Sequence, residues 1–250
     1  SAPSSHILKP GSRDFAHMPA NEHFCMRLAA ASGLPIPASE VLRKASALYL
    51  VQRYDRIETG DGLTRIHQID FCQALNLPAS KKYEQEGGPS LAACFEVIAR
   101  YCAQPARDRL ELISWTIFNY LVGNADAHAK NLSLLITADG VSLAPFYDLI
   151  STVVYRGLTS RLALKIGGEN RPDWIQERHW KAFADVSGAN PRIVWRRMAE
   201  LSGAMPGKAR ELLAALDPAD GERQLLERVC ATVEKRAARL AGLKAVRQQA

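Results

Sequence analysis

Features that mark secreted, disulfide-stabilised or membrane-spanning proteins are scarce in this chain. Its five cysteines, at positions 25, 72, 94, 102 and 230, are scattered and form no Cys-x-x-Cys pair. An odd, scattered set gives no disulfide framework, so we interpret these residues as small core residues in a reducing compartment. No apolar run approaches the ~20 residues that span a membrane, and no basic segment followed by an apolar one marks a secretory leader. We therefore expect a cytosolic protein that does not contact the membrane.

The composition is typical of a globular protein and has an excess of basic over acidic residues. Hydrophobic residues make up 47% of the 250 residues, enough for two lobes that share a core. Lys and Arg number 32 against 26 Asp and Glu, which gives a net charge of +6. This balance permits contact with nucleic acid or with an acidic partner, but it distinguishes neither.

Two carboxylates and one amide follow one another in an informative order. Residues 124–131 read NADAHAKN, and residues 146–148 read FYD. Phosphoryl transfer requires a base that orients the attacking hydroxyl, and oxygen ligands for the magnesium that accompanies nucleotide phosphates. Asp126 is the candidate base, and Asn131 and Asp148 are the candidate magnesium ligands. The amide is informative because its oxygen binds a hard cation without adding negative charge beside the phosphates.

The flanking pattern places these residues on a loop and at the end of a hairpin. The preceding segment has apolar residues at helical spacing, namely Leu110, Ile113, Ile117 and Leu121, and Gly123 ends that helix. Residues 132–136 and 141–144 are predicted strands joined by a turn, so the hairpin delivers Asp148. Alternatively, Asp126 and Asn131 cap turns and Asp148 caps a following helix, since Asp and Asn are common at both places.

These stretches resemble the catalytic core of HipA-type serine/threonine kinases, the toxins of bacterial toxin–antitoxin pairs. Further stretches match in the family's order: HILKP at 6–10, NE at 21–22, VQRYDR at 51–56, KYE at 82–84 with GGP at 87–89, and LALKIG at 162–167. The order of loop, hairpin and metal-binding Asp is that of protein kinases, although the His-Arg-Asp and Asp-Phe-Gly motifs are absent. From about Gln176 the resemblance extends only to a helical tail of similar kind.

The resemblance implies a nucleotide-phosphate ligand on the first predicted strand. Lys9 follows the strand at 6–8, and a compact ammonium on a fixed strand can reach the α- and β-phosphates. Glu22 begins a helix that stops at Gly33 and is the candidate partner that holds Lys9 in position. The alternatives are a solvated surface lysine and an acidic residue in a first helical turn, where the helix dipole favours it.

A small antiparallel sheet is predicted for the first quarter of the chain. Its strands are the Lys9 strand, 41–43, 48–51 and 63–67, the last of them following an Asp61-Gly62 turn. The strongest of these strands leads into Gln52, Arg53 and Tyr54.

The resemblance places the hinge between the lobes at Gln52, Arg53 and Tyr54. We expect the main chain there to bind adenine, with Tyr54 packing near the base. Alternatively, Arg53 joins Asp55 and Arg56 in a surface charge cluster.

Three further residues belong to the predicted site. The resemblance places His128 and Tyr147 among the nucleotide-binding residues. His128 has no second His or Cys at ligand spacing for zinc, and the dominance of oxygen donors favours magnesium. Lys130 is a candidate to neutralise charge on the transferred phosphoryl group, or else a solvated loop lysine.

Several predictions concern the larger, helical part. We expect a short helix at 69–75, a helix start at Gly87-Gly88-Pro89 and a strand at 161–166. The glycine pair lacks the Gly-x-Gly-x-x-Gly spacing of a phosphate cradle, and we interpret it as structural. Residues 151–160 occupy the place of a kinase activation segment. The basic residues of a final helix from about Gly221 form a solvated face, or alternatively a surface for a partner or a phosphate backbone.

Together these interpretations predict an α+β, two-lobed protein-kinase-like fold, with a partial β N-lobe at 1–67 and a helical C-lobe at 68–250. The resemblance implies ATP and Mg²⁺, transfer of the γ-phosphate to a protein hydroxyl, and growth arrest through a translation component such as an aminoacyl-tRNA synthetase. It also implies a HipB-like helix-turn-helix antitoxin as partner, with DNA contacted only through that antitoxin.

Family members carry a small N-terminal subdomain and a glycine-rich, serine-containing loop upstream of the 6–10 strand, and this chain starts after them. A second hypothesis is therefore a catalytically incomplete kinase-like module that binds the antitoxin and, through it, operator DNA. A third, a direct DNA binder that uses the C-terminal basic helix, has no base-reading motif to support it.

Overall fold

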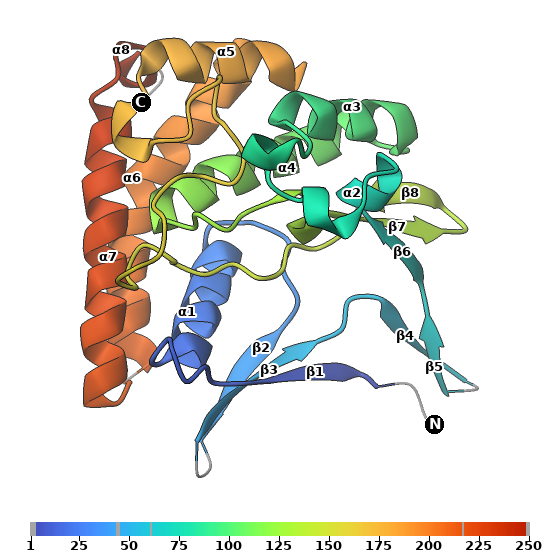
Figure 1. Cartoon of the computed structure of the whole chain (residues 1–250), viewed down its shortest axis with the longest axis vertical. Helices are drawn as coiled ribbons and strands as arrows, with labels where there is room; N and C mark the ends of the chain where they lie inside the picture. The colour runs from blue at the N-terminus through green and yellow to red at the C-terminus, as the bar shows by residue number, and fades with distance from the viewer. Residues whose placement is uncertain (1–3, 44–45, 61, 217, 249–250) are drawn as a thin grey trace.

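The chain folds into a small β-rich lobe and a larger helical lobe. The computed structural model describes residues 4–43, 46–60, 62–216 and 218–248. In Figure 1 the strands of the small lobe lie at the lower right, and the helices of the larger lobe form the left and upper parts.

The small lobe is built on a three-stranded antiparallel sheet in the order β1-β3-β2. Its strands are β1 (His6–Pro10), β2 (Ser39–Arg43) and β3 (Ala47–Gln52). Lys9 lies opposite Tyr49 in the register. The helix α1 (Met18–Ala31) packs against β2 and β3 and buries nearly its whole length. It starts before the predicted Asn21 because Pro19 occupies its first turn, where a missing N–H costs nothing.

The predicted extension of this sheet was wrong. Among the described residues, the strands β4 (Arg56–Thr59) and β5 (Gly62–Arg65) pair only with each other, and β6 (His67–Asp70) pairs with β7 of the helical lobe. Asp61, in the predicted hairpin turn, lies outside the described residues.

The predicted helix at 69–75 also begins too early. Ile69 belongs to β6, and α2 spans only Phe71–Ala74. Asp70 fixes this start because its side chain accepts a hydrogen bond from the Gln73 backbone N–H at 2.9 Å, while the Gln73 side-chain oxygen accepts one from the Asp70 N–H.

The helical lobe encloses the core around α4 (Pro105–Val122). The other helices are α3 (Leu91–Tyr101), α5 (Glu177–Ser187), α6 (Pro191–Leu216), α7 (Asp220–Ala241) and the short α8 (Lys244–Arg247), with 3₁₀ turns at 79–81, 84–86, 129–131 and 172–174. The long helices α6 and α7 run side by side along one edge of the molecule (Figure 1). The glycine pair precedes a helix as predicted, since Ser90 caps α3 by accepting from the Ala93 N–H.

The loop that carries Asp126 is held between α4 and a hairpin. The strands β7 (Ser133–Thr137) and β8 (Gly140–Leu143) form the predicted hairpin and complete the sheet β6-β7-β8. Gly123 ends α4 with a φ of 77°, and a Cβ there would lie 2.4 Å from Val153 Cγ2. Both the left-handed backbone and the close approach require glycine at this turn.

The predicted strand at 161–166 is absent. The structure shows only an isolated bridge between Ile166 and Glu169. Leu162, Ala163 and Leu164 are buried one after another, which a strand with one solvated face does not allow. Backbone and side-chain groups of other segments satisfy this backbone instead; for example, the Glu84 N–H donates to the Ala163 carbonyl, and the Glu84 side chain accepts from the Lys165 N–H at 2.6 Å.

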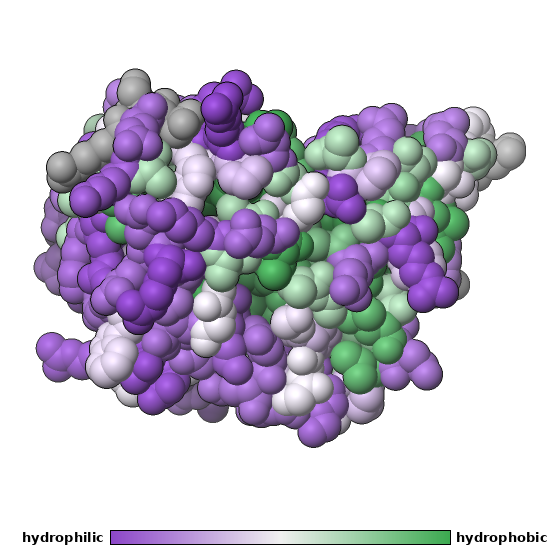
Figure 2. Space-filling model, turned by 90° about the horizontal axis from the view of Figure 1, so that it is seen from above, coloured by the Kyte–Doolittle hydropathy of each residue, from purple (hydrophilic) through white to green (hydrophobic). Residues whose placement is uncertain are grey.

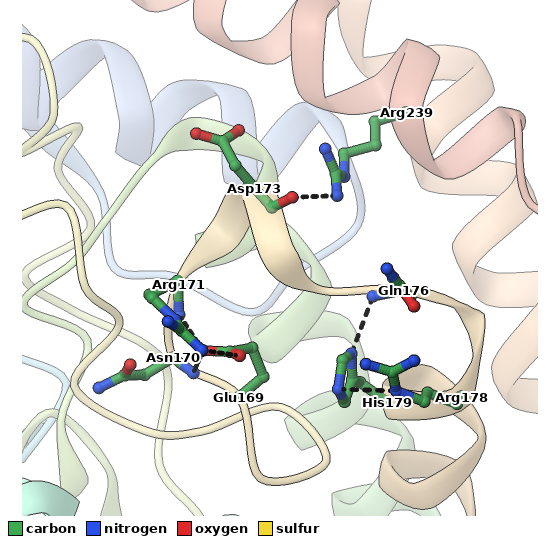
Figure 3. A network of polar contacts seen from close by, with 8 residues as sticks. All are labelled: Glu169, Asn170, Arg171, Asp173, Gln176, Arg178, His179 and Arg239. Carbon is green, nitrogen blue, oxygen red and sulfur yellow. Dashed lines mark hydrogen bonds and ion pairs between the residues drawn. The ribbon is translucent and has the colours of Figure 1, made fainter.

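Some of the basic residues on the last helix bind other parts of the helical lobe instead of forming a solvated face. Arg239 donates to the carbonyls of Asp173 and Ile175 and so fixes the turn before α5 (Figure 3). Half-buried Arg236 donates to the Tyr120 carbonyl and lies over the Tyr120 ring. These two cations therefore hold the helical lobe together, because helix-terminal carbonyls need donors.

The surface and the cysteines agree with the composition. Viewed from above, hydrophilic residues cover most of the α5–α7 side, and more hydrophobic residues show toward the middle and the β7–β8 side (Figure 2). All five cysteines are free and buried. Among the described residues, no helix combines the length and the apolar character needed to cross a bilayer.

Candidate active site

A cavity of about 220 Å³ lies between the sheet of the small lobe and the helical lobe. Ile7, Pro37 and Val51 give it apolar walls on the small-lobe side. It also brings the predicted magnesium ligand Asp148 together with most of the predicted nucleotide-binding residues, namely Lys9, Glu22, Gln52, Arg53, Tyr54 and Tyr147. A narrow apolar slot with charged groups converging on it has the character of a cofactor site.

Lys9 is the centre of the charged part of this cavity. Its Nζ lies 2.8 Å from Glu22 Oε1 and also contacts Asp148 Oδ1. Burial lowers the pKa of the Lys9 ammonium, but the adjacent carboxylates of Glu22 and Asp148 outweigh that effect and raise it overall. The ammonium is therefore charged and held in one place, as a phosphate ligand must be.

Glu22 is the buried member of this group. Burial raises the pKa of its carboxyl from about 4.5 to about 7, although the neighbouring Lys9 lowers it. The expected pairing of Glu22 with Lys9 is present in the structure. Its neighbour Asn21 ties α1 to residue 151, with Oδ1 accepting from the Ser151 N–H at 3.0 Å and Nδ2 donating to the Ser151 carbonyl at 2.9 Å.

Asn131 and Asp148 meet at the edge of the cavity. The Asn131 amide donates to Asp148 Oδ2 at 3.3 Å, and its Oδ1 accepts from the His128 N–H at 3.1 Å. Asp148 adopts a φ of 54°, a left-handed conformation that costs roughly 1–2 kcal/mol for most residues and least for Asp, Asn and Gly. This backbone conformation puts the carboxylate beside both Lys9 and Asn131.

The donor set of Asn131 and Asp148 fits magnesium. Asp148 contributes carboxylate oxygens, and its side chain is 42% exposed and lines the cavity. Asn131 contributes an amide oxygen, which accepts from the His128 N–H and has a second lone pair for a cation. In the described part of the chain no cluster of three His, Cys, Asp or Glu residues is arranged for a metal. Mg²⁺ is commonly held by only one or two protein oxygens together with water and substrate phosphates, so this small set suffices.

Asp126 opens into a second cavity of about 510 Å³. Its walls are mostly apolar and come from the start of α1, from residues 150–163 and from Tyr83. The loop around Asp126 is fixed by buried hydrogen bonds: Asn124 Oδ1 accepts from the Asp126 N–H at 3.1 Å, and Thr152 Oγ1 accepts from the Ala125 N–H at 2.8 Å. The Asp126 carboxylate itself is exposed to this cavity.

The structure places Lys130 and His128 apart from the two cavities. Lys130 Nζ lies 2.6 Å from Asp70 Oδ2, so its charge is already paired. His128 is buried against the edge of the Tyr83 ring, with 5.3 Å between the ring centroids. Burial lowers the pKa of His128, and the charge of Asp126 opposes that effect only in part. Neither residue lines the Lys9 cavity.

The segment at the predicted hinge is stabilised by its own contacts. Tyr54 stacks on Tyr147 with 5.7 Å between ring centroids, and its hydroxyl donates to Gln68 Oε1 at 2.6 Å. The N–H groups of Gln52 and Arg53 already donate to the carbonyls of Ala38 and Ser5. An adenine contact at this segment must therefore use its other main-chain groups.

Arg53 and its neighbours do not form a surface cluster. The Arg53 guanidinium donates to both oxygens of Asp55 at 2.9 and 2.8 Å, and Arg56 donates to the same carboxylate. Asp55 is 2% exposed. Although burial raises the pKa of Asp55, the hydrogen bonds and charges of the two arginines lower it overall, so the carboxylate stays ionised.

Sequence reasoning missed three residues that shape the site: Tyr83, whose hydroxyl donates to Asp126, Asp70, which holds Lys130, and Thr152, which braces the Asp126 loop. Tyr83 belongs to the KYE stretch that formed part of the resemblance, and that family match could have pointed to Tyr83 as a site residue. Asp70 and Thr152 had none, because their partners are far away in the sequence.

Comparison with known proteins agrees with the fold. Residues 1–209 match the family described as HipA-like C-terminal domain. The serine/threonine-protein kinase toxin HipA of Shewanella oneidensis is 31% identical over 231 residues, which are 87% of this chain and 53% of that protein. A Sinorhizobium fredii protein named "Putative kinase Y4mE" is 44% identical over 200 residues, 79% of this chain and 48% of its own length. The chain thus spans about half the length of these curated relatives.

Solved structures show the same fold. HipA in the Shewanella oneidensis complex of HipA, HipB and operator DNA superposes with a TM-score of 0.90 at 28% identity, covering 98% of this chain and 60% of that chain. The Helicobacter pylori proinflammatory kinase CtkA superposes with a TM-score of 0.63 at 12% identity, covering 94% of this chain and 91% of its own, and shows the fold alone.

The two lobes therefore form a protein-kinase-like α+β fold, and this prediction is confirmed. Within that class, the chain belongs to the HipA-like C-terminal domain family.

Proposed function

We propose that the protein is an ATP-dependent serine/threonine kinase of the HipA toxin type. The observation that carries this proposal is the charged network in the cavity between the lobes, where Lys9 contacts Glu22 and Asp148. Asn131 joins this network through its hydrogen bond to Asp148. The match to a HipA kinase over most of the chain supports it.

Each residue then has a role in phosphoryl transfer. Lys9, held by Glu22, binds the nucleotide phosphates, and the apolar slot near Tyr54 receives the adenine. Asn131 and Asp148 would hold Mg²⁺, which when bound would neutralise the negative charge of the nucleotide phosphates. The protein substrate binds in the 510 Å³ cavity, and Asp126 accepts the proton of its acceptor hydroxyl.

Lys130 has a different role from the one suggested by its position in the loop. Its ammonium bonds to Asp70, and Tyr147 donates to its carbonyl at 2.6 Å. We therefore assign Lys130 to the support of the Asn131 turn, joining it to β6, rather than to the transferred phosphoryl group.

The proposed biological setting follows from the relatives. A Shewanella oneidensis HipA was solved together with HipB and operator DNA. We propose a HipB-like helix-turn-helix antitoxin as partner of this protein, with DNA contacted through it, and a cytoplasmic translation protein, such as an aminoacyl-tRNA synthetase, as the acceptor.

Nucleotide binding is tested by thermal unfolding with Mg-ATP. A ligand at 100 times its dissociation constant stabilises the native state by about 2.7 kcal/mol, so the melting temperature rises. Asp148→Asn retains a residue that tolerates the left-handed backbone but removes the charge, and we expect it to abolish most of this rise.

Asp173→Asn is the matched control, because its side chain is 75% exposed and lies outside both cavities. This variant should respond to Mg-ATP as the wild type does. A wild type that Mg-ATP does not stabilise would contradict the proposal and favour a module that only binds a partner.

A further inference from the structure

Tyr83 directly contacts the proposed base. Its hydroxyl donates to Asp126 Oδ1 at 2.6 Å. Burial, and then this bond to the carboxylate, raise the pKa of the Tyr83 phenol, so it keeps its proton and remains a donor at neutral pH. Among the described residues, no other hydrogen bond to the Asp126 carboxylate is found, and without Tyr83 this exposed side chain would be free to rotate.

The backbone around Tyr83 is fixed on both sides. The Glu84 N–H donates to the Ala163 carbonyl at 3.1 Å, and the Glu84 side chain accepts from the Lys165 N–H at 2.6 Å. In the other direction, the Gly88 N–H donates to the Tyr83 carbonyl at 2.9 Å. Tyr83 is thus presented to Asp126 from a segment anchored on residues 163–165.

The glycine pair explains how this segment folds back. A Cβ at Gly88 would lie 2.5 Å from the Lys81 carbonyl oxygen and 2.6 Å from the Tyr83 carbonyl oxygen, closer than any real side chain comes. Gly87 adopts a φ of 84°. The stretch from Lys82 to Pro89 is therefore one unit, in which the glycines close the turn, Glu84 anchors it and Tyr83 reaches the loop of Asp126.

We propose that Tyr83 is a positioning residue for the acceptor side of the site. It holds one oxygen of Asp126 and leaves the other to the acceptor hydroxyl in the 510 Å³ cavity, whose wall Tyr83 shares with Asp126. This inference rests on the proposed kinase function. It differs from a packing role, because the hydroxyl and not the ring is what acts on Asp126.

The test compares Tyr83→Phe with the wild type. The readout is phosphate incorporation into a degenerate peptide library with Ser or Thr at its fixed centre. We expect kcat to fall roughly tenfold to a hundredfold, the range that misplacement of a catalytic group produces. The KM for ATP and the Mg-ATP thermal shift should stay unchanged, since Tyr83 lies outside the nucleotide cavity. Tyr101→Phe, on a 42% exposed residue in neither cavity, is the matched control.

A double-variant comparison separates positioning from a general structural effect. In an Asp126→Ala background, Tyr83→Phe should cause no further loss of the residual activity, because the group it positions is gone. An additive loss, or a Tyr83→Phe protein as active as the wild type, would overturn the inference and leave the kinase function standing. A wild type that binds Mg-ATP but phosphorylates neither the library nor itself would overturn the kinase function and this inference with it.

Discussion

The two cavities on either side of the Asp126–Asp148 region differ in chemistry as well as size. The smaller one, about 220 Å³, holds a network of charged groups formed by Lys9, Glu22 and Asp148, of which Glu22 is buried. The larger one, about 510 Å³, is mostly apolar and has Asp126 and Tyr83 in its wall. Fixed charges suit a ligand of constant structure such as a nucleotide, whereas a mostly apolar hollow with few charged groups, among them Asp126 and Glu86, suits a varied protein segment. Under the proposed function, this difference predicts that some substitutions impair nucleotide binding and others impair proton transfer.

The largest effect should come from Asp126→Asn. We expect phosphate incorporation to fall by roughly 10²–10⁴-fold, the contribution of a general base, while the Mg-ATP thermal shift is retained. Radiolabel transfer and thermal unfolding on the same sample measure the two properties. A loss of nucleotide binding equal to the loss of transfer would show that Asp126 is structural and that the two cavities are not independent.

The second prediction concerns how the free energy of unfolding depends on pH through Glu22 in the smaller cavity. The pKa of Glu22 is raised from about 4.5 to about 7, so between these values the folded protein binds more protons than the unfolded chain. Its contribution to stability is therefore complete below pH 4.5 and is lost as the pH rises through 7, by up to about 3 kcal/mol. Chemical denaturation of wild type and Glu22→Gln from pH 5 to 8 measures this. The variant should lose less stability over that range, and equal slopes would show that Glu22 does not titrate there.

The smallest effect should come from Lys130→Ala. Its ion pair with Asp70 is partly exposed, so we expect a loss of only about 0.2–1 kcal/mol in the free energy of unfolding. Phosphate incorporation should fall by less than about tenfold, far less than for a group that acts on the reacting phosphoryl. A loss as large as that of Asp126→Asn would return Lys130 to the catalytic set and place it at the boundary between the two cavities.

The sequence was informative where a residue's role depends on local order. Asn131 and Asp148 lie in one short stretch of loop and hairpin, and the structure brings these two predicted magnesium ligands into contact. The Lys9–Glu22 pair was predicted from the resemblance to kinases rather than from spacing. Lys130 pairs with a residue 60 positions away, and Asp126 with one 43 positions away. Local spacing contains no signal for such contacts, because they depend on how separate elements pack.

Strand prediction failed for a related reason. Alternation at 161–166 predicts a strand with two different faces. The structure buries three successive residues there and satisfies the backbone through Glu84 and Asn170. The pattern of apolar residues alone cannot show that other segments supply these hydrogen bonds.

The pairing of β6 with β7 has a consequence for any attempt to study the lobes one at a time. The connection from the small lobe contributes an edge strand to the hairpin that follows the Asp126 loop and leads to Asp148. A helical half expressed from residue 71 onward would therefore leave β7 with unpaired backbone groups along one side, which favours intermolecular strand pairing and aggregation. A truncated protein that retains residues 67–70 should be more soluble, because this short strand keeps the backbone of β7 paired.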